Sequence, residues 1–286
     1  RVAGVEAFQF DDRVVLGLSG HIVGIDYPQG YNNWQKVDCK DLIRAEIVVR
    51  PIQEKIISAL HKLGKEADRV TIATDYDREG ELIGVEALKI VEEAKPKIKA
   101  DRVRYSAIVK DEIIKAFQDS GAVDYDLAAS GEARQIIDLV WGAALTRYIS
   151  LTSGRLGKEF LSVGRVQSPT LALIVDREKE IQSFVPQPYW EIYADLEKEL
   201  RVQHAKGRIW EKSEVDGIIS RLGPEGIINS IETKQRIDRP PAPFDTTGFI
   251  AAASGIGLSA ANAMRIAEWL YTNGFISYPR TDNTVY

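Results

Sequence analysis

The segment from residue 68 to residue 94, DRVTIATDYDREGELIGVEALKIVEEA, constrains the fold more than any other part of the sequence. It begins with an apolar run typical of a buried strand, continues through a short acidic loop and ends with helical periodicity. A strand that leads directly into a helix is half of a β-α-β unit. We therefore expect an α/β region with a mainly parallel sheet in the first part of the chain.

The loop at the end of this strand carries Asp75, Asp77, Glu79 and Glu81. Ligands of open α/β sheets gather at the carboxyl ends of strands. Carboxylates this close repel one another unless water or a cation screens them, and oxygen ligands of this kind suit Mg²⁺. The loop therefore predicts either a magnesium site or a solvated surface loop whose acids favour a helix N-terminus.

Helical periodicity recurs along the chain. The predicted helices span residues 50–67, with a stop at Gly64, and residues 111–121, 128–154 and 168–184. Residues 13–25 are β-rich, with a tight turn predicted at Ser19–Gly20. The pattern indicates a short-stranded first region followed by a mostly helical one.

Proline-rich junctions divide the last third of the chain. Residues 185–200, VPQPYWEIYADLEKEL, predict a β segment after two prolines, and residues 237–247, IDRPPAPFDTT, form a second junction. Two short helices are predicted next, with a stop at Gly274, before a strand in FISYPRTD, residues 275–282. Helix, helix and strand in this order predict a winged-helix type module.

Composition excludes several classes of protein. The formal net charge of the 286 residues is −5, which argues against a uniformly basic nucleic-acid coat but allows a local basic groove. No apolar run approaches the ~20 residues of a membrane helix, so we expect no membrane partner. The single cysteine, Cys39, excludes an internal disulfide and a cysteine-built zinc site, and favours a reducing, cytoplasmic location. His21, His61 and His204 have no metal-ligand spacing, and we expect structural or surface roles for them.

A local basic region lies between residues 140 and 170. It contains Arg147, Arg155, Lys158 and Arg165 against one acid, Glu159, and the neutral donors Gln167 and Ser168, which suit phosphates and sugars. The region predicts either a nucleic-acid groove or a solvated charged face. Arg134 and Asp138 are four residues apart on a predicted helix and can pair, either at a functional site or as a surface ion pair contributing under ~1 kcal/mol.

The sequence SYPRTDN, residues 277–283, places a tyrosine beside an arginine. A phenol has a pKa of about 10 and is a poor nucleophile at neutral pH. It attacks a phosphodiester only where a positive charge favours the phenolate and stabilises the transition state. Arg280 is always charged and lies on the same side as Tyr278 if the chain is extended, and Asp282 can orient Arg280. The stretch predicts either a supported nucleophile or an ordinary strand tyrosine.

Several stretches, in order along nearly the whole chain, resemble one enzyme family. DYDREGE, residues 75–81, resembles the D-x-D-x-E-G-E motif of TOPRIM domains, found in topoisomerases, primases and some nucleases. SGEARQIIDLVWGAALTR, residues 130–147, and LSVGRVQSPTLALIVDREKEI, residues 161–181, resemble the helical domain of type IA DNA topoisomerases. PPAPFDTT and NGFISYPRTDNTVY resemble the segment that leads to their active-site tyrosine, in a form most similar to archaeal members.

The resemblance implies a reaction. Tyr278 would attack a phosphate of single-stranded or underwound DNA, form a 5′-phosphotyrosyl bond and leave a 3′ hydroxyl that reseals the strand after strand passage, without ATP. The implied catalytic residues are Tyr278, Arg280 and Glu79, and the implied Mg²⁺ ligands are Asp75, Asp77 and Glu79. The implied DNA-binding residues are Arg134, Asp138, Arg147, Arg165, Gln167, Ser168 and Asp282, with Asp138 holding Arg134.

The resemblance also implies a division of the chain. We expect a TOPRIM domain over residues 1–122, a helical DNA-binding domain over 123–184, part of a β-arch domain over 185–241 and the start of a winged-helix-like domain over 242–286. The family's first TOPRIM strand carries a glutamate with a lysine nearby, and Glu6, fourteen residues before Gly20, is too close to be that glutamate. The family also continues beyond the tyrosine to close a toroid. We therefore expect a piece of a longer enzyme, without that strand and without the return half of the arch.

Two other functions stay open at this point. A TOPRIM primase or nuclease would use the acids of residues 75–81 but not Tyr278. A non-catalytic fragment would bind single-stranded DNA without forming an adduct. For the topoisomerase function that the resemblance implies, we expect a cytoplasmic, nucleoid-associated location, and the sequence predicts no particular protein partner.

Overall fold

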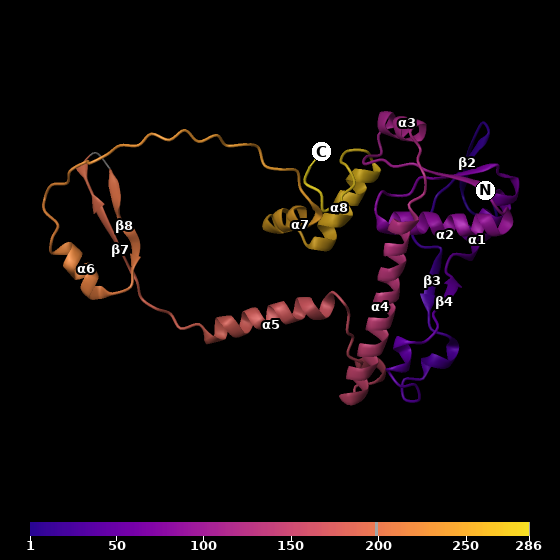
Figure 1. The fold of residues 1–286 in the computed structure, drawn as a ribbon, viewed down its shortest axis with the longest axis horizontal. Helices are drawn as coiled ribbons and strands as arrows, with labels where there is room; N and C mark the ends of the chain where they lie inside the picture. Colours follow the sequence, from indigo (N-terminus) through magenta and orange to yellow (C-terminus); the bar gives the residue numbers. More distant parts are fainter. Residues whose placement is uncertain (198–199, 286) are drawn as a thin grey trace. The chain divides into compact units, whose positions relative to one another are not determined.

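The structure is a computed structural model that describes residues 1–197 and 200–285. The chain forms two compact units (Figure 1): unit 1 consists of residues 1–168 and 241–286, and unit 2 consists of residues 169–240. Unit 1 therefore combines the first part of the chain with its last part. The finer division into four domains stays a prediction.

Unit 1 contains three pairs of short strands. β1 (Ala7–Phe10) pairs with β2 (Arg13–Leu16) and β3 (Val23–Asp26) with β4 (Val48–Pro51), both antiparallel, whereas β5 (Arg69–Ile72) and β6 (Lys99–Arg102) are parallel. The α/β class is confirmed, but the expectation of a mainly parallel sheet is corrected, because β5–β6 is the one parallel pair in the described part of the chain. Parallel strands need a crossover connection, and in unit 1 a helix supplies one between β5 and β6.

Two helices cover this parallel pair. α1 (Glu54–Glu66) packs against α2 (Arg78–Ala94), the crossover helix, and Leu88 and Val91 of α2 bury with Ile72 and Ile98. The start of α2 is fixed because the Asp77 side chain accepts a hydrogen bond of 2.7 Å from the Gly80 N–H group, as a helix N-cap does.

The predicted helix stop at Gly64 is wrong. α1 continues to Glu66, and Gly64 is a packing position, because a Cβ at this residue would lie 2.9 Å from a methyl group of Val91. Gly64 is needed because it has no side chain, and not because its backbone has more conformational freedom. The sequence pattern alone does not separate the two uses.

Two further helices follow β6: α3 (Lys110–Gln118) and α4 (Tyr125–Thr152), the longest helix of the described residues. α4 begins at Asp124, whose side chain caps the Leu127 N–H group and whose own N–H group donates to buried Glu81. Its second half packs on the segment between β3 and β4, where Tyr27 and Leu42 bury against α4. That segment contains the short 3-10 helices η1 (Gln29–Asn32) and η2 (Asp41–Ile43). A third, η3 (Gly157–Glu159), follows α4.

The last part of unit 1 consists of α7 (Thr246–Gly255) and α8 (Ala260–Thr272), as predicted. The strand predicted after Gly274 is absent, because residues 275–285 contain no strand. The backbone there bonds to irregular partners instead: the Tyr278 N–H group donates to the Ser106 carbonyl, and the Thr246 hydroxyl donates to the carbonyls of Pro279 and Thr281. These contacts replace a sheet ladder.

Unit 2 consists of a helix, a hairpin and a short helix. α5 (Gln167–Ser183) begins two residues before the unit boundary, β7 (Trp190–Asp195) and β8 (Arg201–Ile209) pair antiparallel, and α6 (Lys212–Ile219) follows. The β segment predicted over residues 185–200 is present as β7, and its residues 198–199 lie outside the described residues. Residues 224–244 contain no helix or strand.

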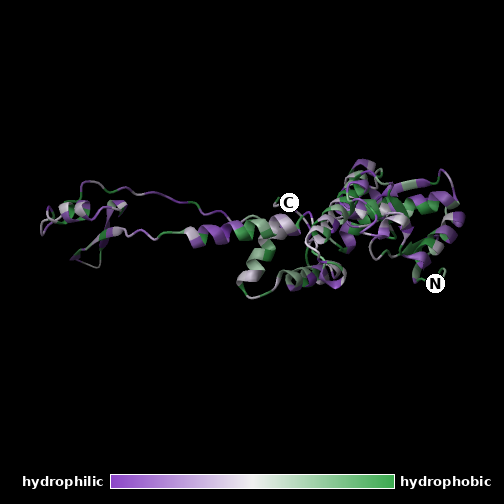
Figure 2. Cartoon of the chain, turned by 90° about the horizontal axis from the view of Figure 1, so that it is seen from below, coloured by the Kyte–Doolittle hydropathy of each residue, from purple (hydrophilic) through white to green (hydrophobic). Residues whose placement is uncertain are grey.

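Hydropathy along the helices follows their packing. Figure 2 shows hydrophobic and hydrophilic colours on the same helices of unit 1, as expected for helices that bury one face. No single helix in the described part of the chain is long and apolar enough to cross a membrane. Taken together, α7 and α8 have the length and apolar composition of a membrane span, but the two helices meet at a bend of 118°.

Candidate active site

The carboxyl ends of β5 and β6 lie side by side because the two strands are parallel. The acidic loop follows β5, and a short segment, residues 103–109, follows β6. The chain after α8 docks on this edge: the Tyr278 N–H group donates to the Ser106 carbonyl at 2.7 Å. Gly274 has a φ of +75°, and a Cβ there would lie 2.7 Å from the Ile108 carbonyl oxygen, so the close approach needs glycine.

Glu112 of α3 fixes the surface on which this segment docks. One of its carboxylate oxygens accepts hydrogen bonds from the N–H and hydroxyl groups of Ser106 and from the Ala107 N–H group. Burial raises the pKa of Glu112, but these hydrogen bonds outweigh burial and hold the pKa below its ordinary value. The carbonyl group that receives Tyr278 is therefore held in place by an ionised side chain.

Tyr278 donates its phenol hydrogen to Asp77 Oδ2 over 2.6 Å, while Asp77 Oδ1 caps α2. Burial raises the pKa of the Tyr278 phenol far above its usual range, and Asp77 and Asp75 raise the pKa further. Arg280 acts in the opposite direction. In this arrangement the phenol is protonated and held against the acidic loop.

A second tyrosine, Tyr271 of α8, repeats this contact. Its side chain is only 4% exposed, its hydroxyl donates to Asp75 Oδ1 at 2.9 Å, and its ring meets Tyr278 edge to face with 5.1 Å between centroids. Burial raises the pKa of Asp75, and the hydrogen bond from Tyr271 opposes that shift. Each of the two aspartates thus accepts one tyrosine hydroxyl.

Arg280 lies close enough to Tyr278 to lower the pKa of the phenol, as the sequence predicts. Its guanidinium is paired with Glu268 of α8. Asp282, which we expected to orient Arg280, forms no ion pair or hydrogen bond with that residue in the described structure. Glu268 takes this role because α8 brings it alongside the turn that contains Arg280.

Glu79 is bound by groups other than the two aspartates. Its Oε2 atom lies 3.1 Å from His21 Nε2, and its Oε1 atom lies 3.5 Å from a guanidinium nitrogen of Arg134. Within residues 1–197 and 200–285, no three His, Cys, Asp or Glu side chains are grouped so as to hold a metal ion. The predicted three-residue ligand set is therefore not assembled here, because His21 and Arg134 bind both oxygens of Glu79.

His21 is the site residue that the sequence prediction missed most clearly. Its Nδ1 atom lies 2.9 Å from Glu86 Oε1, its ring contacts the Gln135 amide, and Glu86 is only 7% exposed. The second oxygen of Glu86 accepts the Ile22 N–H group. His21 and Glu79 are 58 residues apart in sequence, so no local spacing signals this cluster.

The predicted pair of Arg134 and Asp138 is present at 3.9 Å. Asp138 is bound more closely by Arg165, through hydrogen bonds of 2.6 and 3.2 Å, which hold the pKa of Asp138 below its ordinary value. Gln167 and Ser168 follow two residues later, at the start of α5, where the Ser168 N–H group donates to the Gly164 carbonyl. Arg134, Asp138 and Arg165 thus form one charged group connected to Glu79.

Arg147 lies apart from this group, and its predicted role in DNA contact is corrected. The side chain is 6% exposed, donates to the Tyr31 carbonyl at 2.6 Å and lies 5.5 Å from the centre of the Trp34 ring. A guanidinium buried in this way ties α4 to the segment after β3. It is not accessible to a phosphate.

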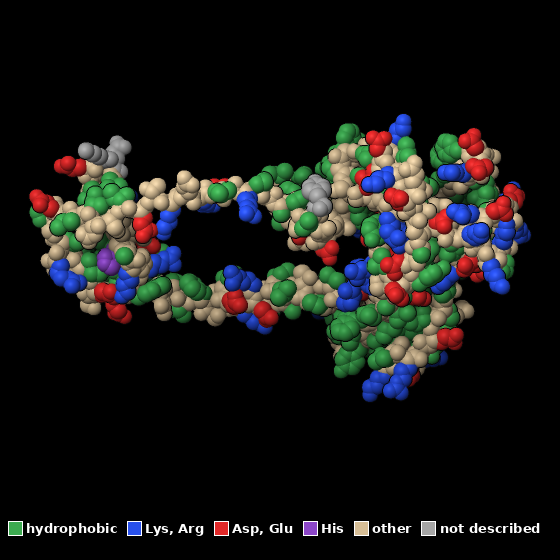
Figure 3. Space-filling view, turned by 45° about the horizontal axis from the view of Figure 1, so that its top comes forward, with side chains coloured by type: hydrophobic (Ala, Val, Ile, Leu, Met, Phe, Trp, Pro, Cys, Tyr) green, Lys and Arg blue, Asp and Glu red, His purple; other side chains and the backbone are tan. Residues whose placement is uncertain are grey.

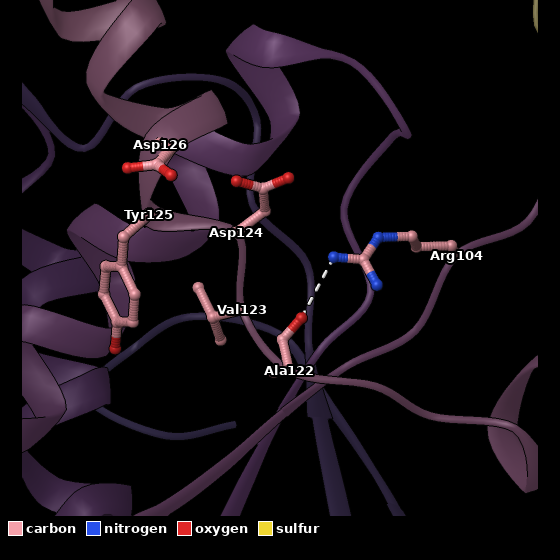
Figure 4. A pocket seen from close by; sticks show the side chains of 6 residues that line it. All are labelled: Arg104, Ala122, Val123, Asp124, Tyr125 and Asp126. Carbon is pink, nitrogen blue, oxygen red and sulfur yellow. Dashed lines mark hydrogen bonds between the residues drawn. The ribbon is translucent and has the colours of Figure 1, made fainter.

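The surface charges and one cavity near α4 do not point to a binding site. Figure 3 shows basic and acidic side chains interspersed over the visible face of unit 1, without a uniformly basic coat. A cavity of about 460 Å³ at the start of α4, lined by Arg104 and residues 122–126, contains none of the predicted site residues. In Figure 4 the Arg104 guanidinium donates a hydrogen bond to the Ala122 carbonyl. One of the guanidinium donors is therefore already used within the protein.

Comparison with known proteins fits this geometry. Residues 122–286 match the DNA topoisomerase family, and residues 3–108 match the Toprim domain. This chain belongs to the type IA DNA topoisomerase family. The DNA topoisomerase 1 of Archaeoglobus fulgidus is 52% identical over 276 residues, which cover 96% of this chain and 41% of that protein. The DNA topoisomerase 1 of Thermoplasma acidophilum is 47% identical over 275 residues, or 95% of this chain and 35% of that protein.

A solved topoisomerase I structure has a similar fold. The full-length topoisomerase I of Thermotoga maritima matches with a TM-score of 0.66 and 31% sequence identity, over 93% of this chain and 45% of that chain. The chain thus spans less than half the length of these topoisomerases. The family predicted from the motifs is confirmed, including the likeness to archaeal members.

Proposed function

We propose that this chain carries the DNA cleavage and rejoining site of an ATP-independent type IA topoisomerase that acts on single-stranded or underwound DNA. The observation that carries the proposal is the 2.6 Å hydrogen bond between Tyr278 and Asp77. It joins a phenol with a neighbouring guanidinium to a pair of carboxylates at the end of a strand. The proposed location is cytoplasmic and nucleoid-associated, because DNA is the substrate.

In the proposed reaction, the Tyr278 oxygen attacks a phosphorus atom of the bound strand. Its proton passes to Asp77 Oδ2, which already accepts that hydrogen bond. A bond forms between the phenol oxygen and phosphorus, the bond from phosphorus to the 3′ oxygen breaks, and that oxygen takes up a proton. The 5′-phosphotyrosyl bond is also a phosphodiester, so the same hydroxyl reverses the reaction without ATP.

Arg280 supplies the charge that this reaction needs. Its guanidinium lowers the pKa of the phenol and can fork onto phosphate oxygens, where it stabilises the negative charge of the transition state. To do so it exchanges Glu268 for the phosphate. The ion pair with Glu268 keeps the guanidinium neutralised when no DNA is bound.

Asp75 and Asp77 are the residues that would hold Mg²⁺. Each carboxylate retains lone pairs beyond the hydrogen bonds that it accepts, both are hard oxygen donors, and a cation would offset the charge that burial disfavours at Asp75. Held by Asp75 and Asp77, Mg²⁺ would supply positive charge next to the phenol and the 3′ end of the cleaved strand. Glu79 acts beside this pair, through its contacts with His21 and Arg134.

DNA binding is proposed for residues on α4 and just after it. The proposed contacts are Arg134, Asp138, Arg165, Gln167 and Ser168, with Asp282 near the nucleophile. The guanidinium groups of Arg134 and Arg165 meet at Asp138, which orients them toward one strand. Because both arginines are already paired with acids, DNA binding would replace a carboxylate by a phosphate at each guanidinium. The affinity for DNA should therefore depend on the salt concentration.

Trapping the covalent adduct tests the proposal. A longer protein that contains this chain is mixed with a 3′-end-labelled single-stranded oligonucleotide and Mg²⁺, stopped with detergent and analysed on a denaturing gel. Labelled protein should form, and Tyr278→Phe should abolish it. The matched variant Tyr271→Phe should still form the adduct, because the Tyr278 phenol is intact. Hydrolysis or primer synthesis that persists in Tyr278→Phe would instead indicate a primase or nuclease.

A further inference from the structure

Thr246, the first residue of α7, lies against the turn that contains Arg280. Its hydroxyl donates to the carbonyl oxygens of Pro279 at 2.8 Å and of Thr281 at 2.9 Å. The same hydroxyl oxygen accepts the Thr281 N–H group at 2.9 Å, and the Thr246 N–H group donates to the Thr281 carbonyl, also at 2.9 Å. One threonine thus binds the backbone on both sides of Arg280.

The position of Thr246 is itself fixed by the start of α7. Asp245 caps the helix, because its side chain accepts the Gly248 N–H group at 2.6 Å. Phe244, just before the cap, and Phe249, four residues after it, have ring centroids 6.5 Å apart. Apolar residues at these two places form a hydrophobic staple, which sets the angle at which the chain enters a helix. Thr246 therefore gives the turn a fixed point of attachment.

Arg280 needs this attachment because little of its side chain is packed. The side chain is 60% exposed, and its guanidinium is paired with Glu268, which is itself 46% exposed. Under the proposed function, the guanidinium leaves Glu268 for a phosphate oxygen. The backbone of Arg280 then sets how far the guanidinium reaches and in which direction. A misplacement of about 1 Å can lower the rate of a reaction by about 100-fold.

The other end of the same turn is attached to the acidic edge. The Tyr278 N–H group donates to the Ser106 carbonyl at 2.7 Å. Pro279 lies between Tyr278 and Arg280, and its ring fixes its own φ, so few backbone rotations remain between the two attachments. The bonds to Ser106 and Thr246 thus hold the turn on either side of the phenol and the guanidinium.

We infer that Thr246 is a positioning residue for DNA cleavage, whose hydroxyl holds the backbone on both sides of Arg280. The inference rests on the proposed function, because it assigns a role within the same site. Loss of the hydroxyl should lower the rate of bond cleavage rather than the affinity for DNA. The reason is that the proposed DNA contacts on α4 and just after it do not depend on this turn.

Single-turnover cleavage tests the inference. A longer protein that contains this chain is mixed in excess with a 3′-end-labelled oligonucleotide, and the initial rate of covalent adduct formation is measured over a range of protein concentrations. Thr246→Val replaces the hydroxyl by a methyl group. It should lower the maximal rate by about 10- to 100-fold and change the half-maximal protein concentration by less than about 3-fold. Thr246→Ser keeps the hydroxyl and should stay within about 3-fold of the parent rate.

Thr247→Val is the matched control. Thr247 is the next residue of α7, and its side chain is exposed. The same substitution at this position should leave both the maximal rate and the half-maximal concentration within about 2-fold of the parent values. A loss at Thr246 without a loss at Thr247 assigns the effect to the hydroxyl that binds the turn.

A double-mutant cycle separates positioning from a general structural role. If Thr246 acts through Arg280, Thr246→Val should lower the rate by less than about 3-fold in a protein that already carries Arg280→Ala, measured over longer times. A loss of the same size with and without Arg280 would overturn the inference. A parent-like rate of Thr246→Val would overturn it as well.

Thr246→Ala guards against misfolding, because it removes the hydroxyl without adding a methyl group beside the two carbonyls. It should match Thr246→Val in rate and should keep the circular dichroism spectrum of the parent. Unfolding of both variants would count against the inference, since Thr246 would then serve the fold. In all these cases the parent still forms the adduct and the proposed function stands, whereas a parent without adduct would overturn the proposed function itself.

Discussion

Asp77 accepts hydrogen bonds through both carboxylate oxygens, one from the Gly80 N–H group and one from the Tyr278 phenol. Glu86 does the same for the Ile22 N–H group and the His21 ring. In each case one oxygen fixes the backbone and the other orients a side chain of the site. Fold stability and site geometry therefore depend on the same residues.

The first prediction concerns His21. His21→Ala should lower the free energy of unfolding of unit 1 by about 1–3 kcal/mol, because it leaves the buried Glu86 carboxylate without the ring that contacts it. Urea denaturation followed by circular dichroism measures the change. His61→Ala, which removes a histidine in an exposed pair with Glu93, should change the free energy by less than about 0.5 kcal/mol. Equal effects of the two variants would contradict the assignment.

The site was predictable from sequence only where a motif spans it. DYDREGE places Asp75 and Asp77 on one loop, and YPR places Tyr278 and Arg280 on one turn, and the structure brings the two together. Tyr271 binds Asp75 across 196 residues, and Arg280 takes Glu268 as its partner from a neighbouring helix. Such pairings depend on the packing of α8, which a single sequence does not reveal.

At the scale of elements, the acidic loop and the first turn of α2 fit together with no spare volume. A Cβ on Gly80 would lie 2.1 Å from the Asp75 carbonyl oxygen. Arg102, fully buried, donates to the same carbonyl and to that of Thr74, and pairs with Glu81 at 2.7 Å. The two strand ends and the helix start are thereby locked into one arrangement.

Gly80→Ala should therefore destabilise unit 1 by about 1–3 kcal/mol, because the added methyl group has no room next to the Asp75 carbonyl. The midpoint of urea unfolding measures it. Gly142→Ala on α4 is the control: its Cβ would lie 3.8 Å from the nearest atom, and a glycine-to-alanine change inside a helix should stabilise by about 0.5–1 kcal/mol. An unchanged midpoint of urea unfolding in Gly80→Ala would show that the loop can move to make room for the methyl group.

The docking surface for Tyr278 should depend on pH through Glu112. The pKa of Glu112 is lower in the folded protein than its ordinary value of 4.5, so the carboxylate stabilises the fold above that pH. This contribution is lost as pH falls below 4.5 through the folded pKa. Glu112→Gln should cost about 1 kcal/mol near pH 6, and the difference from the parent should shrink toward pH 3. A stability difference that does not change with pH would contradict the assignment of an ionised Glu112 carboxylate to these hydrogen bonds.

Most helices were predictable from periodicity, because an amphipathic pattern records which face is buried. Residues 275–285 were not, since their β-like composition is overridden by bonds to Ser106 and Thr246. The share of parallel strands was overestimated, because one strand-loop-helix unit does not reveal how many other strands pair in parallel.

At the scale of the whole molecule, unit 1 is made from two stretches of chain separated by unit 2. Residues 224–240 contain no helix or strand, and most of their side chains are exposed. A protease at low concentration should therefore cut first within this range. The two products should still co-elute in size-exclusion chromatography, because the docked α7 and α8 hold them together. Separation without denaturant would contradict this docking.

The separation of 201 positions between Asp77 and Tyr278 in the sequence also sets the order in which the two residues are synthesised. A ribosome releases the carboxylates early, and the phenol emerges only after the whole of unit 2 has been made. Under the proposed function, a nascent chain thus folds its acidic edge before it holds the proposed nucleophile, which reaches that edge only once α7 and α8 have docked.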